Sequence, residues 1–472
     1  MKIGNVFLSL LFISIFFVLS DKIVSNYLSS DGVLSEESIL SLTLLRFTII
    51  SFGTLLLFNK KLQSFGDYLT QYWNKVTSES KEKKIEIISF IILLGFISSV
   101  FFHYFIDRYF DFDYPHNTFL FRPENRFYDY INLYNPYKKL APYHDMWAGY
   151  IGAYFPVTVL VFQPFTLTTL YFDLFLFLFF FSLYIFIYIY KHIGMPNKNF
   201  YWNMRNIIIV SLLSWPFLHT FDRANVEWLV FLFLSLFIYL YFNNYVKISL
   251  VFLAAAISMK LIPAVFIILL ICDKRFKEII YVIVMIFIMS LFSLTLFKGG
   301  ISENLNNLMS AMVLNGNLES NTIFGIGFGS SLYNYIKFIT LYLFQVHNAK
   351  FYAKLYIISV IIIFFFLSRY IIKYETVFWR KTFLLVSAMI LFPYVSGDYR
   401  LLHLFIPMCL FINYNTISIY DKIYAILFGL LMISKSYFHA GEISESSFIN
   451  PLILVVFSIM IIREGLEKNS LR

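Results

Sequence analysis

Residues 170–190 have the sequence LYFDLFLFLFFFSLYIFIYIY, which contains a single charged residue, Asp173. A helix of about 20 apolar residues is long enough to cross the hydrocarbon core of a bilayer. The whole chain has the same character, since 59% of its 472 residues are hydrophobic and only 14% are charged, against about 25% charged residues in soluble domains. This composition excludes a soluble enzyme, a disordered protein, a fibre and a nucleic-acid-binding protein. It predicts an all-α, polytopic integral membrane protein.

Other apolar stretches of suitable length predict about twelve membrane crossings in total. The expected helices cover residues 4–20, 39–58, 85–106, 170–190, 206–221, 226–242, 279–297, 352–373, 382–395, 401–414, 420–437 and 447–463. Three further apolar stretches, 154–167, 248–271 and 332–347, are too short or too interrupted to span, so we expect half-helices or re-entrant segments there. Such backbone is tolerated at membrane depth only where it is buried in protein or lines a wet cavity. These stretches therefore suggest a cavity.

The distribution of basic residues predicts the orientation. With the N-terminus inside, most Lys and Arg residues fall on cytoplasmic segments, notably in 59–84 and at Lys274, Arg275 and Lys277, as the positive-inside rule requires. We attribute the net charge of +9 to this bias rather than to nucleic-acid binding. Both termini are then expected in the cytoplasm.

The same topology predicts the domain organisation. Residues 1–84 would form two N-terminal transmembrane helices and a cytoplasmic loop, and residues 85–472 the main transmembrane domain. The two longest polar stretches, 107–149 and 298–331, would both face outward. Function is expected on these stretches or on the short outer turns, because exposed loops on a rigid scaffold commonly carry it.

Asp129 is the candidate catalytic group of the large outer loop 107–149. It could act as a general base that takes a proton from an acceptor hydroxyl. In a helix, however, Arg126 and Asp129 would share a face at i, i+3, so Asp129 could equally be the partner of Arg126 or a helix cap. The many aromatic residues of the loop could stack on sugar rings or could simply lie at the membrane interface.

Asp111 and Asp113 form a D-x-D pattern in the same loop. Two carboxylates at this spacing can hold a hard divalent cation through oxygen ligands. Such a pair arises often by chance, so an ordinary solvated loop is the stronger interpretation. A divalent metal at Asp111 and Asp113 is possible but disfavoured, and we expect no cofactor.

Several further polar groups lie at the outer face or interrupt an apolar stretch. They are Arg223 with Asn225 in a tight turn, Arg400 with His403 at i, i+3, His439 in a short outer turn, and Lys260 inside the stretch 248–271. An ionisable residue within a membrane segment is expensive and suggests function. Fixed cations at this level could stabilise the phosphate of a lipid-linked sugar as the sugar departs. Each could instead simply snorkel to the membrane interface or pair with a neighbour on its own helix.

Together these motifs resemble the glycosyltransferase-C superfamily, and most closely glycosyltransferase family 87, the polyprenyl-phosphate-mannose-dependent mannosyltransferases and their bacterial relatives. The resemblance covers about residues 85–414. It is carried, in order, by the residues Arg126-Phe127-Tyr128-Asp129, Asn135-Pro136-Tyr137, Tyr154-Phe155-Pro156, Arg223-Ala224-Asn225, Ala254 to Pro263 with Lys260, and Asp398-Tyr399-Arg400. This chain has Ala224 where the family tends to have Gly.

The resemblance implies a specific reaction. Asp129 would be the catalytic carboxylate, and Arg400, His403, Lys260, Arg223 and Arg126 would bind the donor phosphate or sugar, with Asp111, Asp113, His439 and Asn225 as secondary candidates. The donor would be a polyprenyl-phosphate-linked sugar, mannose or a similar hexose, and transfer would invert the anomeric centre without a metal. The acceptor would be a hydroxyl of a cell-envelope glycolipid or polysaccharide. The enzyme would lie in the bacterial inner membrane with its active site on the outer face.

Two alternatives fit the same layout of helices and polar outer loops. A surface-polysaccharide polymerase would move whole lipid-linked repeat units. A transporter or flippase would move a lipid-linked sugar without transfer, but transporters usually contain inverted repeats with matching midplane ionisable groups. The sequence shows no matched halves, and its polar residues gather on one face.

Overall fold

The computed structural model describes residues 81–110, 126–143, 154–322, 326, 329–344, 350–414, 420–435, 437, 439–440 and 443–470, and these residues are predominantly helical. The first half contains α5 (Lys81–Phe110), α6 (Tyr128–Lys138), α7 (Pro156–Phe162), α8 (Leu170–Ile193), α9 (Phe200–Leu212), α10 (Trp215–Arg223), α11 (Glu227–Phe242), α12 (Val246–Met259) and α13 (Ile267–Cys272). The second half contains α14 (Phe276–Thr295), α15 (Gly300–Asn321), α16 (Tyr333–Lys337), α17 (Lys350–Lys373), α18 (Phe378–Leu391), α19 (Phe405–Ile412), α20 (Asp421–Leu431) and α21 (Ser446–Ser470).

Short elements complete the described part of the chain. They are the 3-10 helices η1 (Gln163–Phe165), η2 (Ile262–Phe266) and η4 (Asp398–Leu404), the π-helical segment η3 (Phe338–Leu343), and the strands β1 (His439–Ala440) and β2 (Ile443–Ser444). The two strands pair antiparallel in a two-residue hairpin ladder.

Five of the described helices, α5, α8, α14, α17 and α21, are long and apolar enough to cross a membrane by length and composition. Five of the predicted crossings therefore have helices of full length. The other predicted crossings within the described residues form shorter or broken helices. The predicted helices 4–20 and 39–58 lie outside the described residues.

The single helix predicted over 206–221 is wrong, because the chain breaks there into α9 and α10. Ser214 is extended, and α10 begins at Trp215 with Pro216 in its first turn. Proline lacks the backbone N–H that a continuous helix needs, but it is tolerated in a first turn where that donor has no partner. The polar stretch 298–331 forms mainly a helix, α15.

The break predicted within 248–271 is confirmed. α12 ends at Met259, Lys260 has an extended backbone, and η2 begins at Ile262 with Pro263 as its second residue. Proline disfavours a helical conformation of the residue before it and cannot donate to a preceding turn. The stretch 154–167 forms the short helices α7 and η1, and the described part of 332–347 forms the short helices α16 and η3, so these helices are too short to span, as expected.

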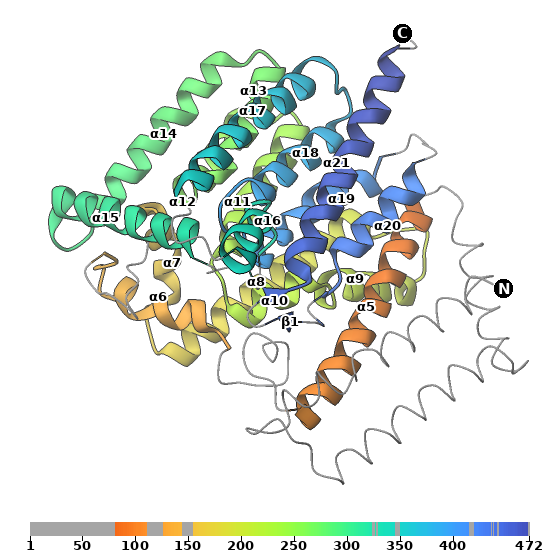
Figure 1. Ribbon diagram of the computed structural model, residues 1–472, viewed down its shortest axis with the longest axis horizontal. Coiled ribbons are helices and arrows are strands. Elements are labelled where there is room, and N and C mark those ends of the chain that lie inside the picture. The colour runs from red at the N-terminus through yellow and green to blue at the C-terminus, as the bar shows by residue number, and fades with distance from the viewer. Residues whose placement is uncertain are drawn as a thin grey trace, which may run out of the picture.

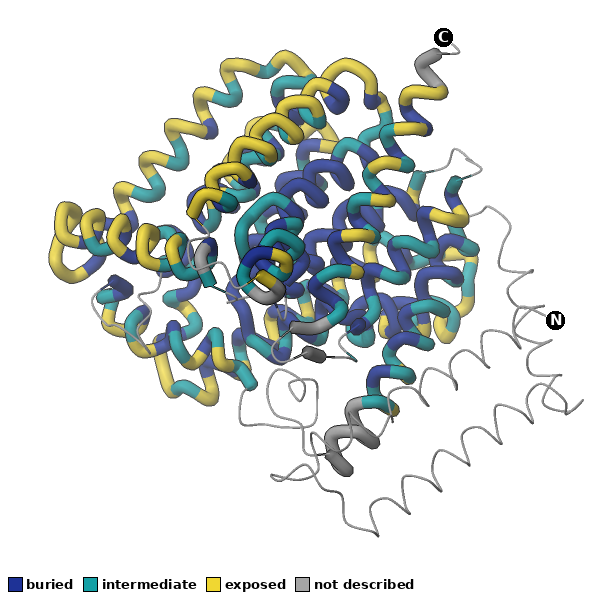
Figure 2. The backbone as a smooth tube through the Cα atoms, viewed as in Figure 1, coloured by how far each residue is buried: buried dark blue, intermediate teal, exposed yellow. Residues whose placement is uncertain are grey.

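The core of the bundle lies around α11 and α12. Both helices are buried over much of their length, and the first residues of α11, Glu227 to Phe231, are buried on every side of the helix. Figure 2 shows the buried residues in the middle of the molecule and exposed residues along α14, α15 and α17. A helix that is apolar all round must be enclosed by protein or lipid. Because other helices of the protein bury most of α11, it lies at the centre of the bundle.

The helices α6 and α15 lie at the same end of the bundle, away from the end that carries the C-terminus (Figure 1). α15 runs across the end of α14 rather than continuing it. The turn between the two helices contains Gly299 and Gly300, both with positive φ. The helices α6 and α15, which belong to the stretches 107–149 and 298–331, thus lie at the same end of the bundle.

Candidate active site

Asp129 lies in the first turn of α6 and is held by two side chains from another part of the chain. One of its oxygens, Oδ1, accepts a hydrogen bond from Arg223 Nη2 at 2.6 Å, and the other, Oδ2, accepts one from Asn225 Nδ2 at 2.6 Å. The Asp129 side chain is 20% exposed. Both contacts come from the turn between α10 and α11, so sequence-distant motifs meet at this carboxylate.

Arg126 does not pair with Asp129, so the suggested i, i+3 ion pair is wrong. Helix α6 begins only at Tyr128, after Phe127 in a left-handed conformation. The Phe127 N–H donates to the Asp222 carbonyl at 2.7 Å, and Arg126 Nε lies 3.6 Å from Asp222 Oδ1. Burial raises the pKa of Asp222 to about 7, although Arg126 and Arg223 act in the opposite direction. Arg126 therefore anchors α6 to α10.

Asn225 connects Asp129 to the start of α11. Its side-chain amide donates to Asp129, while its Oδ1 accepts the Glu227 N–H at 2.9 Å. Both polar ends of a fully buried amide are used, which fixes its orientation. Ala224, the residue before it, has φ 46° and ψ 47° and ends α10 in the left-handed region.

Glu227, the first residue of α11, is a second carboxylate of the site. Its Oε1 lies 2.7 Å from His403 Nε2, and its Oε2 accepts a hydrogen bond from Lys260 Nζ. The side chains of Glu227 and His403 are almost completely buried, whereas that of Lys260 is 13% exposed. We call Asp129, Arg223, Asn225, Glu227, Lys260 and His403 the Asp129 cluster.

Two tyrosine rings flank Lys260. Its Nζ lies 5.2 Å from the centre of the Tyr154 ring and 5.3 Å from that of Tyr399, which are cation–π distances. The break after α12 is itself held by Thr158 of α7, whose hydroxyl donates to the Met259 carbonyl at 2.8 Å. The break thus places the Lys260 ammonium beside these two rings and in contact with the Glu227 carboxylate.

Arg400 lies on η4 beside this group. Its Nε and Nη1 atoms are buried and have no hydrogen-bond partner among the residues that the structure describes. The neighbouring Tyr399 lies close enough to Asp129, Glu227 and Arg400 to interact electrostatically with each. Arg400 therefore has donors available for an anionic ligand, and the cation of Lys260 is already compensated by Glu227.

Asp398 positions this segment of η4. Its carboxylate accepts hydrogen bonds from Ser330 Oγ at 2.7 Å and from Trp215 Nε1 at 3.1 Å, and it is 1% exposed. These contacts tie η4 to α10. These hydrogen bonds have a structural role. They hold Tyr399 and Arg400, the two residues that follow Asp398, next to Lys260.

Glu319 brings α15 to the same region. Burial raises the pKa of its carboxyl above the usual range, while the charges of Arg400, Lys337 and Lys260 lower it. Glu319 was not among the predicted site residues, because it stands within a long polar stretch with other hydrophilic residues. Only its place at the C-terminal end of an amphipathic helix sets it apart.

The other predicted positions have different outcomes. Asp111 and Asp113 lie outside the described residues. His439 is in β1, where the structure describes only the backbone. Within the described part of the chain, no group of three or more His, Cys, Asp or Glu side chains is arranged to hold a metal ion.

Sequence reasoning missed Glu227. It was assigned simply to the start of an apolar crossing, 226–242. An acid two residues after an Arg-x-Asn turn and at the edge of an apolar helix was the available signal, since ionisable groups in membrane segments usually have a functional partner.

Two carboxylates, Asp129 and Glu227, converge here with Arg223 of α10, Lys260 after α12 and the η4 residues Arg400 and His403. Such an arrangement in a helical membrane protein is suited to group transfer. The model of glycosyltransferase family 87 matches residues 153–393, which is just over half of the chain. The chain belongs to glycosyltransferase family 87 and is a membrane glycosyltransferase. No curated protein and no solved structure was found to match it.

Proposed function

We propose that the enzyme transfers a hexose, mannose or a similar sugar, from a polyprenyl-phosphate donor to a hydroxyl of a cell-envelope glycolipid or polysaccharide. The reaction takes place on the outer face of the bacterial inner membrane and inverts the anomeric centre. The convergence of Asp129, Lys260 and Arg400 supports this proposal most directly. Membership of family 87 favours it over the polymerase and transporter alternatives.

Asp129 acts as the general base in this proposal. Each carboxylate oxygen can accept two hydrogen bonds, and Arg223 and Asn225 use one on each oxygen. A free lone pair therefore remains for the acceptor hydroxyl, and the two bonds fix the plane of the carboxylate. As the acceptor oxygen attacks the anomeric carbon, its proton passes to Asp129 and the bond from that carbon to the phosphate oxygen breaks.

Arg400 and Lys260 stabilise the polyprenyl phosphate that leaves. Negative charge grows on the phosphate as the sugar departs, and prearranged donors in a site with little water are effective at that moment. The Nε and Nη1 atoms of Arg400, which have no hydrogen-bond partner within the described part of the chain, are suited to a phosphate oxygen. Because these side chains supply the positive charge, we propose that transfer needs no metal.

The test is Asp129→Asn, assayed in membranes supplied with a polyprenyl-phosphate hexose. The amide keeps the size of the side chain but cannot take the proton, and general-base catalysis contributes about 100- to 10,000-fold. We expect transfer to fall by at least about 100-fold, with normal amounts of protein in the membrane. Glu303→Gln, which changes an exposed acid on α15, is the control and should keep wild-type transfer. Near-normal turnover by Asp129→Asn would remove Asp129 from the mechanism.

A further inference from the structure

The carboxylate of Glu227 makes two contacts at once, although the proposed transfer assigns it no proton and no substrate. One oxygen contacts His403 at 2.7 Å and the other contacts Lys260. The side chain is 3% exposed. A charged side chain buried to this extent has to be compensated by its neighbours.

The surroundings of Lys260 explain why it needs this carboxylate. The ammonium group emerges from a break between apolar helices, where an uncompensated charge is costly. The titratable or charged groups that face it from the elements packed around it are Glu227 of α11, Asp129 of α6, Glu319 of α15, Tyr154 before α7, and Tyr399, Arg400 and His403 of η4. Of the carboxylates among them, only Glu227 is in direct contact with the ammonium. Arg400 is itself positive, so its charge disfavours the protonated form of Lys260.

We propose that Glu227 is a positioning residue that keeps Lys260 protonated and aimed at the site of the departing phosphate. Asn225 adds a second link, because it accepts the Glu227 N–H and donates to Asp129. The base and the phosphate-binding cation are thereby attached to the same turn of chain at the start of α11. This inference rests on the proposed function for its consequence in catalysis, but the charge of Lys260 can be measured independently.

The first experiment compares transfer by wild type and Glu227→Gln from pH 6 to pH 8.5. The amide keeps the shape and the acceptor oxygen but removes the counter-charge. Lys260 then loses its proton at a lower pH, so transfer by the variant should decline as the pH rises, by about tenfold for each unit by which the transition moves below the assay pH. Wild type should not show this decline. A merely structural role would reduce activity equally at all pH values.

Two further variants test whether loss of the Lys260 proton causes the decline at high pH. In Glu227→Gln combined with Lys260→Arg, the guanidinium stays charged throughout this range, so the decline at high pH should disappear. His403→Gln removes the other partner of Glu227 and leaves the Lys260 contact in place, so it should show no new pH dependence. A decline that persists in the double variant, or that appears equally in His403→Gln, would overturn the proposal.

The second experiment does not depend on transfer. Purified protein is exposed briefly at pH 7.5 to an amine-acylating reagent, and modification of Lys260 is measured by peptide mass spectrometry. A neutral amine reacts and an ammonium does not, so Lys260 should be modified at least about tenfold more in Glu227→Gln than in wild type. Equal modification would contradict the proposed role of Glu227.

This measurement also separates the two proposals. If wild type transfers no sugar from a polyprenyl-phosphate hexose, the proposed function fails, while the acylation of Lys260 still decides the role of Glu227. If Glu227→Gln does not accumulate, Glu227→Asp replaces it, because the shorter side chain draws the carboxylate away from Lys260. Acylation should then rise by a smaller factor, and the absence of any rise would overturn the proposal.

Discussion

Ala224 shows how a single residue shapes the site. It is 1% exposed and has φ 46° and ψ 47°, a conformation in which an L-residue is strained by about 1–2 kcal/mol. The strained turn brings Asn225 against Asp129. Gly adopts positive φ without this strain.

We therefore predict that Ala224→Gly keeps transfer activity and does not lower stability. Relief of the strain is partly offset by the greater freedom of Gly in the unfolded chain, about 0.5–1 kcal/mol, which leaves a net gain of about 0–1.5 kcal/mol. Ala256→Gly is the matched control, because Ala256 is also buried but lies within α12. It should lose about 1 kcal/mol. Thermal unfolding in detergent compares the two, and equal losses in both would contradict the explanation.

The residues of the site could be predicted from the sequence where they stand out chemically from their surroundings. Asp129, Lys260 and Arg400 are charged groups in motifs bordered by apolar or aromatic sequence, and the structure brings them to one place. Their partners could not be predicted. The Arg223 contact spans 94 residues of sequence, and only the tertiary packing of α6 against α10 selects Arg223 rather than Arg126 for Asp129.

At the scale of elements, α15 depends on the turn that precedes it. Gly299 and Gly300 have φ values of 90° and 78°, and this turn sends α15 across the end of the bundle. Nothing lies within 4 Å of a side chain added at Gly300 or at Gly316, which is inside the same helix. The two positions therefore differ in backbone conformation and not in available space.

The same substitution is thus predicted to act in opposite directions at these positions. Gly300→Ala should lower stability by about 1–2 kcal/mol because of its positive φ. Gly316→Ala should raise it by about 0.5–1 kcal/mol because Ala loses less entropy in a helix. Chemical or thermal unfolding of the two variants in detergent tests this. A loss at both positions would mean that α15 is displaced by any added methyl group.

Breaks between elements could be predicted where a charged residue accompanies proline inside apolar sequence. Proline and lysine inside apolar sequence indicated the interruption after Met259, and the structure confirms it. The helix over 206–221 was predicted as continuous because the stretch is mainly apolar and contains no Asp, Glu, Lys or Arg, although Pro216 was visible. Apolar composition reports burial or lipid contact, and it does not distinguish one long helix from two short helices packed in protein.

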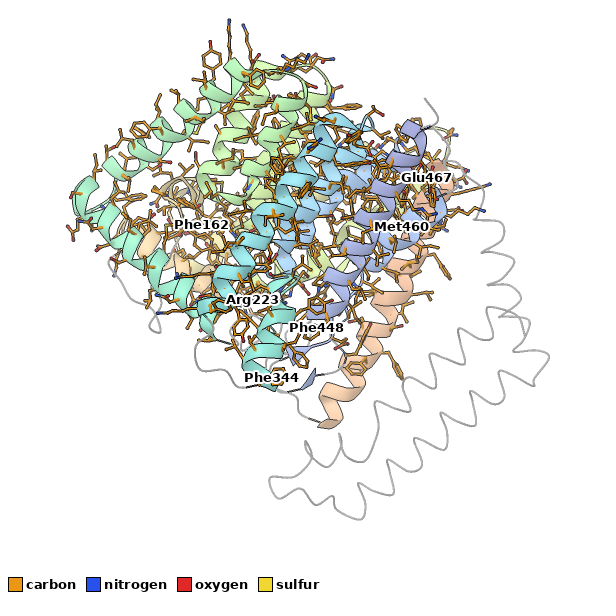
Figure 3. The ribbon with its side chains drawn as sticks, turned by 45° about the horizontal axis from the view of Figure 1, so that its top comes forward. Phe162, Arg223, Phe344, Phe448, Met460 and Glu467 are labelled. Atoms are coloured by element: carbon orange, nitrogen blue, oxygen red, sulfur yellow. The ribbon has the colours of Figure 1, made fainter. Side chains whose placement is uncertain are left out.

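At the scale of the whole molecule, the Asp129 cluster is separated from a buried ion pair near the C-terminal end of the bundle. The Asp129 cluster lies toward one end, whereas Glu467 of α21 lies toward the other, as the positions of Arg223 and Glu467 show in Figure 3. Near that second end, Arg380 of α18 contacts Glu464 of α21 at 2.5 Å, and the Tyr424 hydroxyl of α20 donates to Glu464 at 2.7 Å. This buried ion pair and hydrogen bond join α18, α20 and α21, and they involve no residue of the Asp129 cluster.

Stability and catalysis should therefore separate in Glu464→Gln. The side chains of Arg380 and Glu464 are 2% and 3% exposed, and a buried charge that loses its partner typically costs about 3–5 kcal/mol. Unfolding in detergent should occur at a clearly lower temperature, while transfer per folded molecule stays at the wild-type level because the Asp129 cluster is intact. Glu467→Gln is the control one turn along α21, where the pair with Arg463 is 73% and 48% exposed and should contribute nothing measurable. If Glu464→Gln instead reduced transfer per folded molecule without lowering the unfolding temperature, the two ends of the bundle would be coupled in catalysis and not only in folding.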